Sequence, residues 1–297
     1  MEQKKSKILL AYDGSELSLD AARYAGLVFS PKVTEIVVFY VESKIPRSFW
    51  EMEKDMDFRF NTPEIRASMT ERCKLVKNCM EKAKDILLSA GFPLESITIK
   101  IHTKDQGIVR DIVEESRQGY DAVVVGRKGY SKLKDILFGS VPMKLLGKIN
   151  SIPLIIVGGI PTNRNVLIAF DGNREVLEAV RRMSRLITNR GYNILLCHAS
   201  KTSDDGNMSE PFQKEDFFKQ SIESLTSSGV SQEQLTCELL SGEGNITDNI
   251  IKRALDGRYE SIVIGRRNLS FLEQFFFGRV GDKILHAAGN QVVWVVQ

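Results

Sequence analysis

The segment YDAVVVGRKGYSKLKDILFGSVPMKLLGKINSIPLIIV, residues 120–157, decides the fold because the chain contains it in two versions. The second version, YESIVIGRRNLSFLEQFFFGRVGDKILHAAGNQVVWVV, occupies residues 259–296. The two align without a gap at an offset of 139, and 12 of their 38 positions are identical. Agreement of this extent indicates an internal repeat, so the architecture must be read once per half.

A second repeated pair extends the duplication toward the N-terminus. KILLAYDGS begins at Lys7 and NVLIAFDGN begins at Asn165, an offset of 158. We therefore expect two domains, 1–160 and 161–297, joined at the stretch GGIPTNRN, whose glycines, proline and asparagines are typical of a linker.

Each half alternates short apolar runs with longer amphipathic stretches, which predicts an α/β fold. The apolar runs do not alternate with polar residues, as expected for parallel strands that are covered on both faces. The predicted strands are 7–12, 34–42, 96–103, 121–126 and 153–158, then 165–170, 193–199, 234–240, 260–265 and 291–296. The predicted helices of the first half are 16–29, 64–90, 107–118 and 140–149. Each domain should thus contain a five-stranded parallel sheet flanked by helices.

Composition limits the class of function. The 41 basic and 38 acidic residues leave a formal charge of +3, too balanced for a protein that mainly neutralises a nucleic-acid backbone. No apolar run reaches the roughly 18–20 residues of a membrane span, and the first one is too short for a signal peptide. We therefore expect a cytoplasmic protein with no nucleic-acid or membrane partner. The three histidines show no metal-ligand spacing, and no catalytic residues can be assigned.

A ligand site is predicted where strands end. In an open parallel sheet, ligands bind beyond the carboxyl ends of the strands, where the strand order reverses. Asp13 follows the first predicted strand and Gly126 ends the fourth. We expect the Asp13 carboxylate to accept hydrogen bonds from ribose hydroxyls. The alternatives are that it holds a magnesium ion or that it only closes a turn.

The glycines after the fourth strand suggest a phosphate site. Gly126 and Gly129 would allow close approach of a ligand and positive φ angles, and Ser140 after Gly139 would be the N-cap of the next helix. Free amides at that helix start, with nearby lysines, would attract phosphates, while the second strand offers backbone groups to a base. The predicted first-half site comprises Ala11, Tyr12, Asp13, Val41, Gly126, Lys128, Gly129, Gly139, Ser140 and Val141.

These residues resemble those of the universal stress protein family. Its nucleotide motif, G-x2-G-x9-G-[ST], is matched by Gly126, Gly129, Gly139 and Ser140, and Asp13 matches its aspartate after the first strand. The resemblance implies two doubly wound domains of strand order 3-2-1-4-5 and a bound ATP, or AMP or ADP. It also implies an internal pseudo-dimer, in which the two halves pair through their fifth strands, and in addition a homodimer of the chain.

The second half departs from the motif. Asp171, Gly265 and Gly278 are retained, but Asn268 replaces the second glycine and Arg279 replaces the Ser/Thr. Asparagine tolerates a left-handed backbone, whereas the long arginine side chain would either fill the phosphate space or pair with a phosphate. The favoured expectation is a second site without nucleotide, and a weaker anion site is the alternative.

Three functions remain open. The first is a stress-response or signalling regulator that binds adenine nucleotide and acts through an unidentified protein partner. The second is a slow ATPase or nucleotide hydrolase, and the third is a nucleotide-independent dimerisation or protein-interaction module. The aromatic-rich insertion at 43–64, absent from the second half, would be either a packed excursion or a flap over the site.

Overall fold

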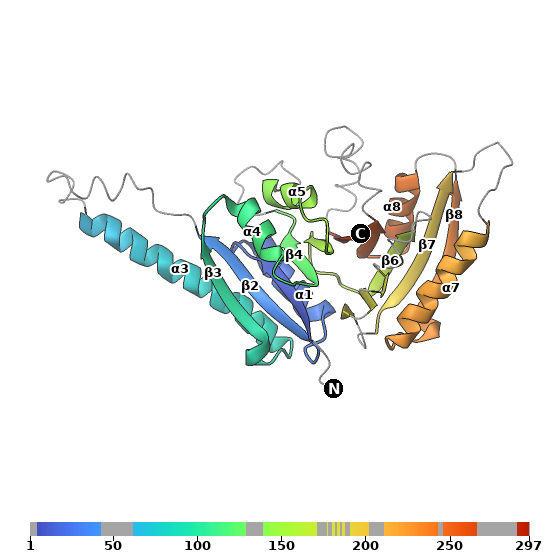
Figure 1. Cartoon of the computed structure of the whole chain (residues 1–297), viewed down its shortest axis with the longest axis horizontal. Helices are drawn as coiled ribbons and strands as arrows, with labels where there is room; N and C mark the ends of the chain where they lie inside the picture. Colours follow the sequence, from blue (N-terminus) through green and yellow to red (C-terminus); the bar gives the residue numbers. More distant parts are fainter. Residues whose placement is uncertain are drawn as a thin grey trace.

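The computed structural model describes residues 5–42, 62–128, 139–170, 191–201, 211–242, 246–265 and 290–296, together with single positions between 177 and 187. The described strands form one ten-stranded sheet of order β3-β2-β1-β4-β5-β10-β9-β6-β7-β8. Figure 1 shows that the first half, blue to green, forms one end of this sheet and the second half, yellow to red, forms the other. No helix among these ranges has the length and apolar character of a membrane span.

The elements of the first half follow the predicted pattern closely. They are β1 (Ser6–Ala11), α1 (Glu16–Val28), β2 (Thr34–Glu42), α3 (Thr62–Ser89), η2 (Leu94–Ser96), β3 (Ile97–Thr103), α4 (Ile108–Ser116), β4 (Ala122–Gly126), α5 (Ser140–Leu146) and β5 (Leu154–Val157). Helix α3 projects beyond the sheet, away from the second half (Figure 1). Most of the 43–64 insertion lies outside the described residues, so its two interpretations stay predictions.

The second half repeats the arrangement. Its elements are β6 (Asn165–Phe170), β7 (Asn193–Lys201), α7 (Pro211–Ser227), η3 (Gln232–Gln234), β8 (Leu235–Gly242), α8 (Ile246–Asp256), β9 (Ser261–Gly265) and β10 (Val292–Val296). Within each half the strands are parallel and ordered third, second, first, fourth, fifth. The predicted fold class is therefore confirmed.

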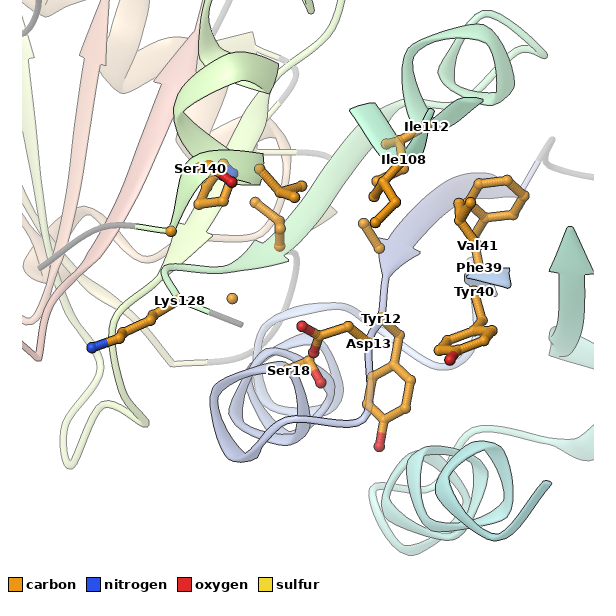
Figure 2. A pocket seen from close by; sticks show the side chains of 16 residues that line it. Tyr12, Asp13, Ser18, Phe39, Tyr40, Val41, Ile108, Ile112, Lys128 and Ser140 are labelled. Atoms are coloured by element: carbon orange, nitrogen blue, oxygen red, sulfur yellow. The ribbon is translucent and has the colours of Figure 1, made fainter. Parts of the chain in front are cut away.

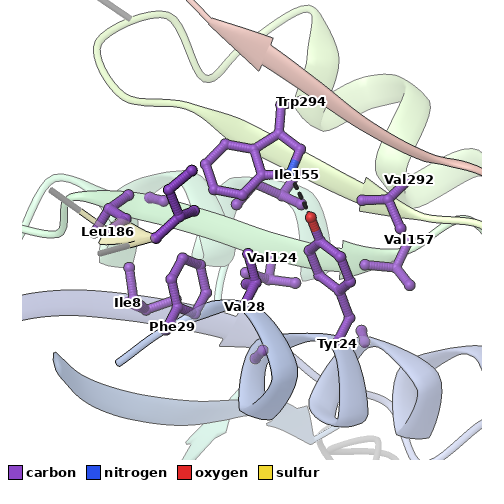
Figure 3. Packing of buried hydrophobic residues seen from close by; sticks show 14 of the residues in the cluster. Ile8, Tyr24, Val28, Phe29, Val124, Ile155, Val157, Leu186, Val292 and Trp294 are labelled. Atoms are coloured by element: carbon purple, nitrogen blue, oxygen red, sulfur yellow. Dashed lines mark hydrogen bonds between the residues drawn. The ribbon is translucent and has the colours of Figure 1, made fainter. Parts of the chain in front are cut away.

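The halves meet through their fifth strands. Strands β5 and β10 pair antiparallel, with Trp294 opposite Ile155. The indole Nε1–H of Trp294 donates to the Tyr24 hydroxyl on α1 at 2.7 Å, and its ring lies 6.1 Å from that of Phe29. Figure 3 shows these side chains packed with Val28, Leu186 and Val292 in one cluster. This apolar cluster therefore continues from the first half into the second.

Two ion pairs at corresponding places carry opposite polarity. In the first half Lys100 on β3 donates to Glu115 on α4 at 2.6 Å. In the second half Glu238 on β8 accepts from Arg253 on α8 at 2.7 Å. The positions correspond, since 238 − 100 and 253 − 115 both equal 138. In each half, therefore, an ion pair joins the third strand to the helix that follows it. The base is on the strand in the first half and on the helix in the second.

The segment between the halves is held in place rather than free. The Glu260 carboxylate accepts hydrogen bonds from the Thr162 N–H, from the Thr162 hydroxyl at 2.8 Å and from the Asn163 N–H at 3.2 Å. Because Glu260 directly precedes β9, these contacts attach the segment before β6 to the start of β9, the strand beside it in the sheet.

Candidate functional site: a crevice beyond the strand ends

A crevice of about 360 Å³ lies beyond the carboxyl ends of β1, β2 and β4, between the starts of α4 and α5. Figure 2 shows that side chains from these elements point into it from both sides of the sheet edge. Its lining residues are Ala11, Tyr12, Asp13, Ser18, Phe39, Tyr40, Val41, Ile108, Ile112, Val125, Gly126, Lys128, Gly139, Ser140, Val141 and Pro142. A space of this size suits a nucleotide-sized ligand.

The structure brings together the described part of the predicted first-half site. All of its members except Gly129, which lies outside the described residues, line the crevice. In the second half, Gly265 ends β9 as the repeat predicts. Asp171, Asn268, Gly278 and Arg279 lie outside the described residues, so the expectation of a degenerate second site stays a prediction.

Asp13 combines a turn with an exposed carboxylate. Its Oδ1 accepts from the Ser15 N–H at 3.0 Å and from the Ser15 hydroxyl at 2.6 Å. Ser15 in turn caps α1 by accepting from the Ser18 N–H at 3.3 Å. Within the described chain no hydrogen bond engages the other carboxylate oxygen, so Asp13 shapes the turn and also presents an acceptor to the crevice.

Gly126 is required by packing, which corrects the sequence-based interpretation. A Cβ at Gly126 would lie 2.6 Å from the Leu17 carbonyl oxygen and 3.0 Å from the Ser18 amide nitrogen, both in the backbone of α1. Its φ angle is not positive, and neither is that of Gly139, at −69°. The missing side chain at Gly126 therefore makes room for α1, and only its main chain faces the crevice.

The start of α5 also differs from the prediction. Gly139, not Ser140, is the N-cap, with extended backbone angles, and its N–H donates to the Arg127 carbonyl at 2.8 Å. These extended angles place Gly139 just outside the helix and make Ser140 the first helical residue. Because Pro142 has no N–H, the first turn of α5 offers the main-chain amides of Ser140 and Val141 to the crevice.

The main chain of Val41 also faces the crevice. The Tyr12 N–H donates to the Phe39 carbonyl, and the Lys104 N–H donates to the Glu42 carbonyl on the opposite side of β2. Since successive residues of a strand direct their N–H and C=O to alternate sides, Val41 points as Phe39 does, toward β1. Strand β1 ends at Ala11, so the Val41 N–H and C=O point past its end into the crevice.

Apolar side chains form one wall of the crevice, and the sequence analysis named only Val41 among them. Phe39 and Val41 come from β2, and Ile108 and Ile112 from the first turns of α4 (Figure 2). The sequence did contain a signal for Ile108 and Ile112, because they stand four residues apart at the start of a predicted helix. Only the strand order, however, shows that this helix borders the crevice. This wall suits a flat apolar ring.

Among the described residues, the crevice lining carries few charges. They are one carboxylate, Asp13, and one ammonium, Lys128. Figure 2 shows the stem of Lys128 at the rim and its ammonium directed away from Asp13. Among the described residues no three His, Cys, Asp or Glu side chains gather as a metal site would require. One Asp13 oxygen is already used by Ser15, so the described residues alone do not form a complete magnesium site, and magnesium at Asp13 stays a prediction.

A parallel sheet with its crevice at the point where strand order reverses defines the chain as a doubly wound α/β protein of the ligand-binding type. The model of the universal stress protein family matches residues 5–158 and again 162–296, so the chain belongs to that family. The strand order and the tandem layout implied by the resemblance are thereby confirmed.

Individual relatives agree with this assignment. A universal stress protein of Methanocaldococcus jannaschii is 28% identical over 161 residues, covering 51% of this chain and 93% of its own length. The structure of a universal stress protein from Archaeoglobus fulgidus covers 98% of this chain and 96% of its own, with 20% identity and a TM-score of 0.59. A Pseudomonas aeruginosa protein of unknown function covers 98% and 92%, with 16% identity and a TM-score of 0.51. The latter two show likeness of fold.

Proposed function

We propose that the crevice of the first half binds an adenine nucleotide, with ATP, ADP and AMP as the candidate ligands. One observation carries the proposal: three kinds of polar group converge on a crevice with an apolar wall. These groups are the main chain of Val41, the free oxygen of Asp13 and the amides of Ser140 and Val141.

The Val41 end suits the base. Its N–H can donate to the adenine N1 and its C=O can accept from the adenine N6 amino group, while the ring lies against Ile108 and Ile112. Asp13, at the middle of the crevice, can then accept from the ribose hydroxyls. The order of the groups along the crevice thus matches the order base, ribose, phosphate.

The Ser140 end suits the phosphates. Helix α5 has only 7 residues, so its dipole adds little, and the amides of Ser140 and Val141 must supply most of the hydrogen bonding. Lys128 at the rim adds a positive charge that a longer phosphate chain can reach. Two universal stress proteins were solved in complex with cAMP and with dAMP, but each covers less than half of this chain, so the argument rests on the crevice.

Calorimetric titration with adenosine, AMP and ATP tests the proposal. We expect all three to bind, with affinity rising with phosphate number. Lys128→Ala should weaken ATP about three- to fivefold and leave adenosine unchanged, as expected for the loss of a single charge contact. Lys148→Ala, an exposed lysine just past α5, is the matched control and should change neither. Absence of binding heat with every one of these ligands would contradict the proposal.

At the level of the whole chain, we propose two domains, 1–160 and 161–297, that act as an internal pseudo-dimer. The antiparallel β5–β10 pair and the Trp294–Tyr24 hydrogen bond support it. The chain would then serve as a cytoplasmic stress-response regulator whose partner choice depends on nucleotide in the first domain. Such control requires a nucleotide that binds one conformation better than another.

A further inference from the structure

A buried carboxylate beside the crevice holds the turn between β3 and α4. Asp111, on α4, is 6% exposed. Its Oδ2 accepts from the Asp105 N–H at 2.9 Å and its Oδ1 from the Gln106 N–H at 3.0 Å. Both carboxylate oxygens thus bind main-chain amides of the turn that leads into the helix.

The helix needs this contact because its start has no other cap. The N-cap of α4 is Gly107, which has no side chain to accept a hydrogen bond and takes a φ of 124°, a conformation that glycine alone adopts readily. Ile108 follows it directly and is 42% exposed at the crevice. The position of Ile108 therefore depends on how the turn is held, and Asp111 holds it.

Asp111 also connects to the wall contributed by β2. The Nε2 of His102 lies 3.8 Å from its Oδ2, and the His102 ring stacks on Phe39 with centroids 5.7 Å apart. Burial opposes ionisation of Asp111, yet the amides of Asp105 and Gln106 and the nearby His102 lower the pKa of this carboxyl. The carboxylate is therefore charged at neutral pH and binds both amides at once.

The second half lacks this carboxylate. The offset of 138 that relates the ion pairs places Ile250 opposite Ile112 and Asn249 opposite Asp111. An asparagine has a single acceptor oxygen, and its amino group cannot pair with a second N–H. The half whose glycine motif is incomplete thus also lacks, at this position, a side chain with two acceptor oxygens.

We propose that Asp111 is a positioning residue for the crevice: by holding the β3–α4 turn it places Ile108 and Ile112 where they receive the adenine ring. The inference rests on the proposed function and extends it to a residue that does not touch the ligand. Binding is strongest when the wall is already in place, because the apparent affinity scales with the fraction of molecules that have the competent arrangement.

The test compares Asp111→Asn with the unsubstituted protein in calorimetric titrations of adenosine, AMP and ATP. Because the wall contacts the base, all three ligands should weaken by the same factor, roughly tenfold if the competent fraction falls to about a tenth. Glu114→Gln, at an exposed carboxylate of the same helix, is the matched control and should leave all three affinities unchanged. Circular dichroism of Asp111→Asn would confirm that the variant is folded.

Amide hydrogen exchange provides a second readout that needs no ligand. The amides of Asp105 and Gln106 should exchange faster in Asp111→Asn, while amides in the middle of β1 stay protected. Unchanged exchange at both positions would overturn the inference even if binding weakened.

The pattern across ligands separates positioning from simple charge. If Asp111 acted only through its negative charge, Asp111→Asn would tighten ATP more than adenosine, and that result would overturn the inference. Equal affinities for the variant and the unsubstituted protein would do the same. If the unsubstituted protein bound none of the three ligands, the proposed function would fail first, and this inference with it.

Discussion

Replacing Gly126 with alanine tests whether this motif glycine serves the fold or the ligand. The added Cβ would lie 2.6 Å from the Leu17 carbonyl oxygen and 2.8 Å from the Leu17 carbonyl carbon, which belong to the first turn of α1. An ordinary contact needs about 3.4 Å, so the strand and helix must separate by about 0.8 Å. The clashing atoms belong to the backbone, which cannot rotate away as a side chain can. The start of α1 is also held in place by the Ser15 cap, so the helix cannot easily shift.

Overpacking of this kind costs typically 1–3 kcal/mol, and because the clash is with backbone we expect about 2–3 kcal/mol for Gly126→Ala. Urea unfolding followed by circular dichroism measures the loss. Gly147→Ala is the matched control: Gly147 has helical angles, and its added Cβ would meet only the Lys144 carbonyl oxygen at 3.8 Å. That variant should be neutral or more stable by up to about 1 kcal/mol.

The comparison distinguishes two roles for Gly126. If this glycine only left room for a ligand, Gly126→Ala would keep the unfolding free energy of the ligand-free protein and lose only nucleotide binding. Equal stability of the Gly126→Ala and Gly147→Ala variants would therefore refute the packing argument. A large loss of stability would also show that binding defects of Gly126→Ala cannot be read as loss of a ligand contact.

Three further predictions concern buried and paired groups. Tyr24→Phe removes the acceptor of the Trp294 indole and should lower the free energy of unfolding by about 1 kcal/mol at pH 8. Because burial raises the pKa of Tyr24 to about 12, the stability that the Tyr24 hydroxyl contributes should be lost as pH rises from 10 toward 12. An alkaline unfolding profile that is unchanged in Tyr24→Phe would contradict this. Lys100→Glu places two negative charges together and should lower the free energy of unfolding. Adding Glu115→Lys should restore about 0.5 kcal/mol of that free energy in a double-mutant cycle. A coupling energy of zero would show that the ion pair contributes nothing to stability. The pKa of Asp111 is lowered from its ordinary 3.8, so the unsubstituted protein should be more stable than Asp111→Asn. This difference in unfolding free energy, measured by urea unfolding, should be complete above about pH 5 and shrink as pH falls below 3.8. A difference that does not change with pH would argue against a charged Asp111.

Much of the fold could be predicted because buried parallel strands leave a strong signal. Unbroken apolar runs such as AVVV, the first four residues of β4, located the strands to within one or two residues, and the internal repeat provided each prediction twice. Pairing of the two fifth strands was a possibility that the family resemblance implied, but the antiparallel direction of the β5–β10 pair was not predicted. The partners of Trp294 were not predictable, because the contact with Tyr24 joins residues 270 positions apart.

The candidate site was predicted less completely, for physical reasons. Asp13 and the glycine motif stand at strand ends, where spacing in the sequence reflects the geometry. The wall formed by Ile108 and Ile112 depends on which elements the topology brings together. The cap of α5 was misplaced by one residue because Gly139, which has no side chain, takes the extended angles of the N-cap, so side-chain preference for Ser140 did not locate the helix start.

The central claim is that the strand-end crevice of the first half holds an adenine nucleotide along a fixed direction. A crystal structure grown with ATP tests it most directly. We predict electron density for the base between Val41 and Ile112, for the ribose at Asp13 and for phosphates at the amides of Ser140 and Val141. Well-diffracting crystals in millimolar ATP that show this crevice empty, or the nucleotide bound elsewhere, would contradict the account.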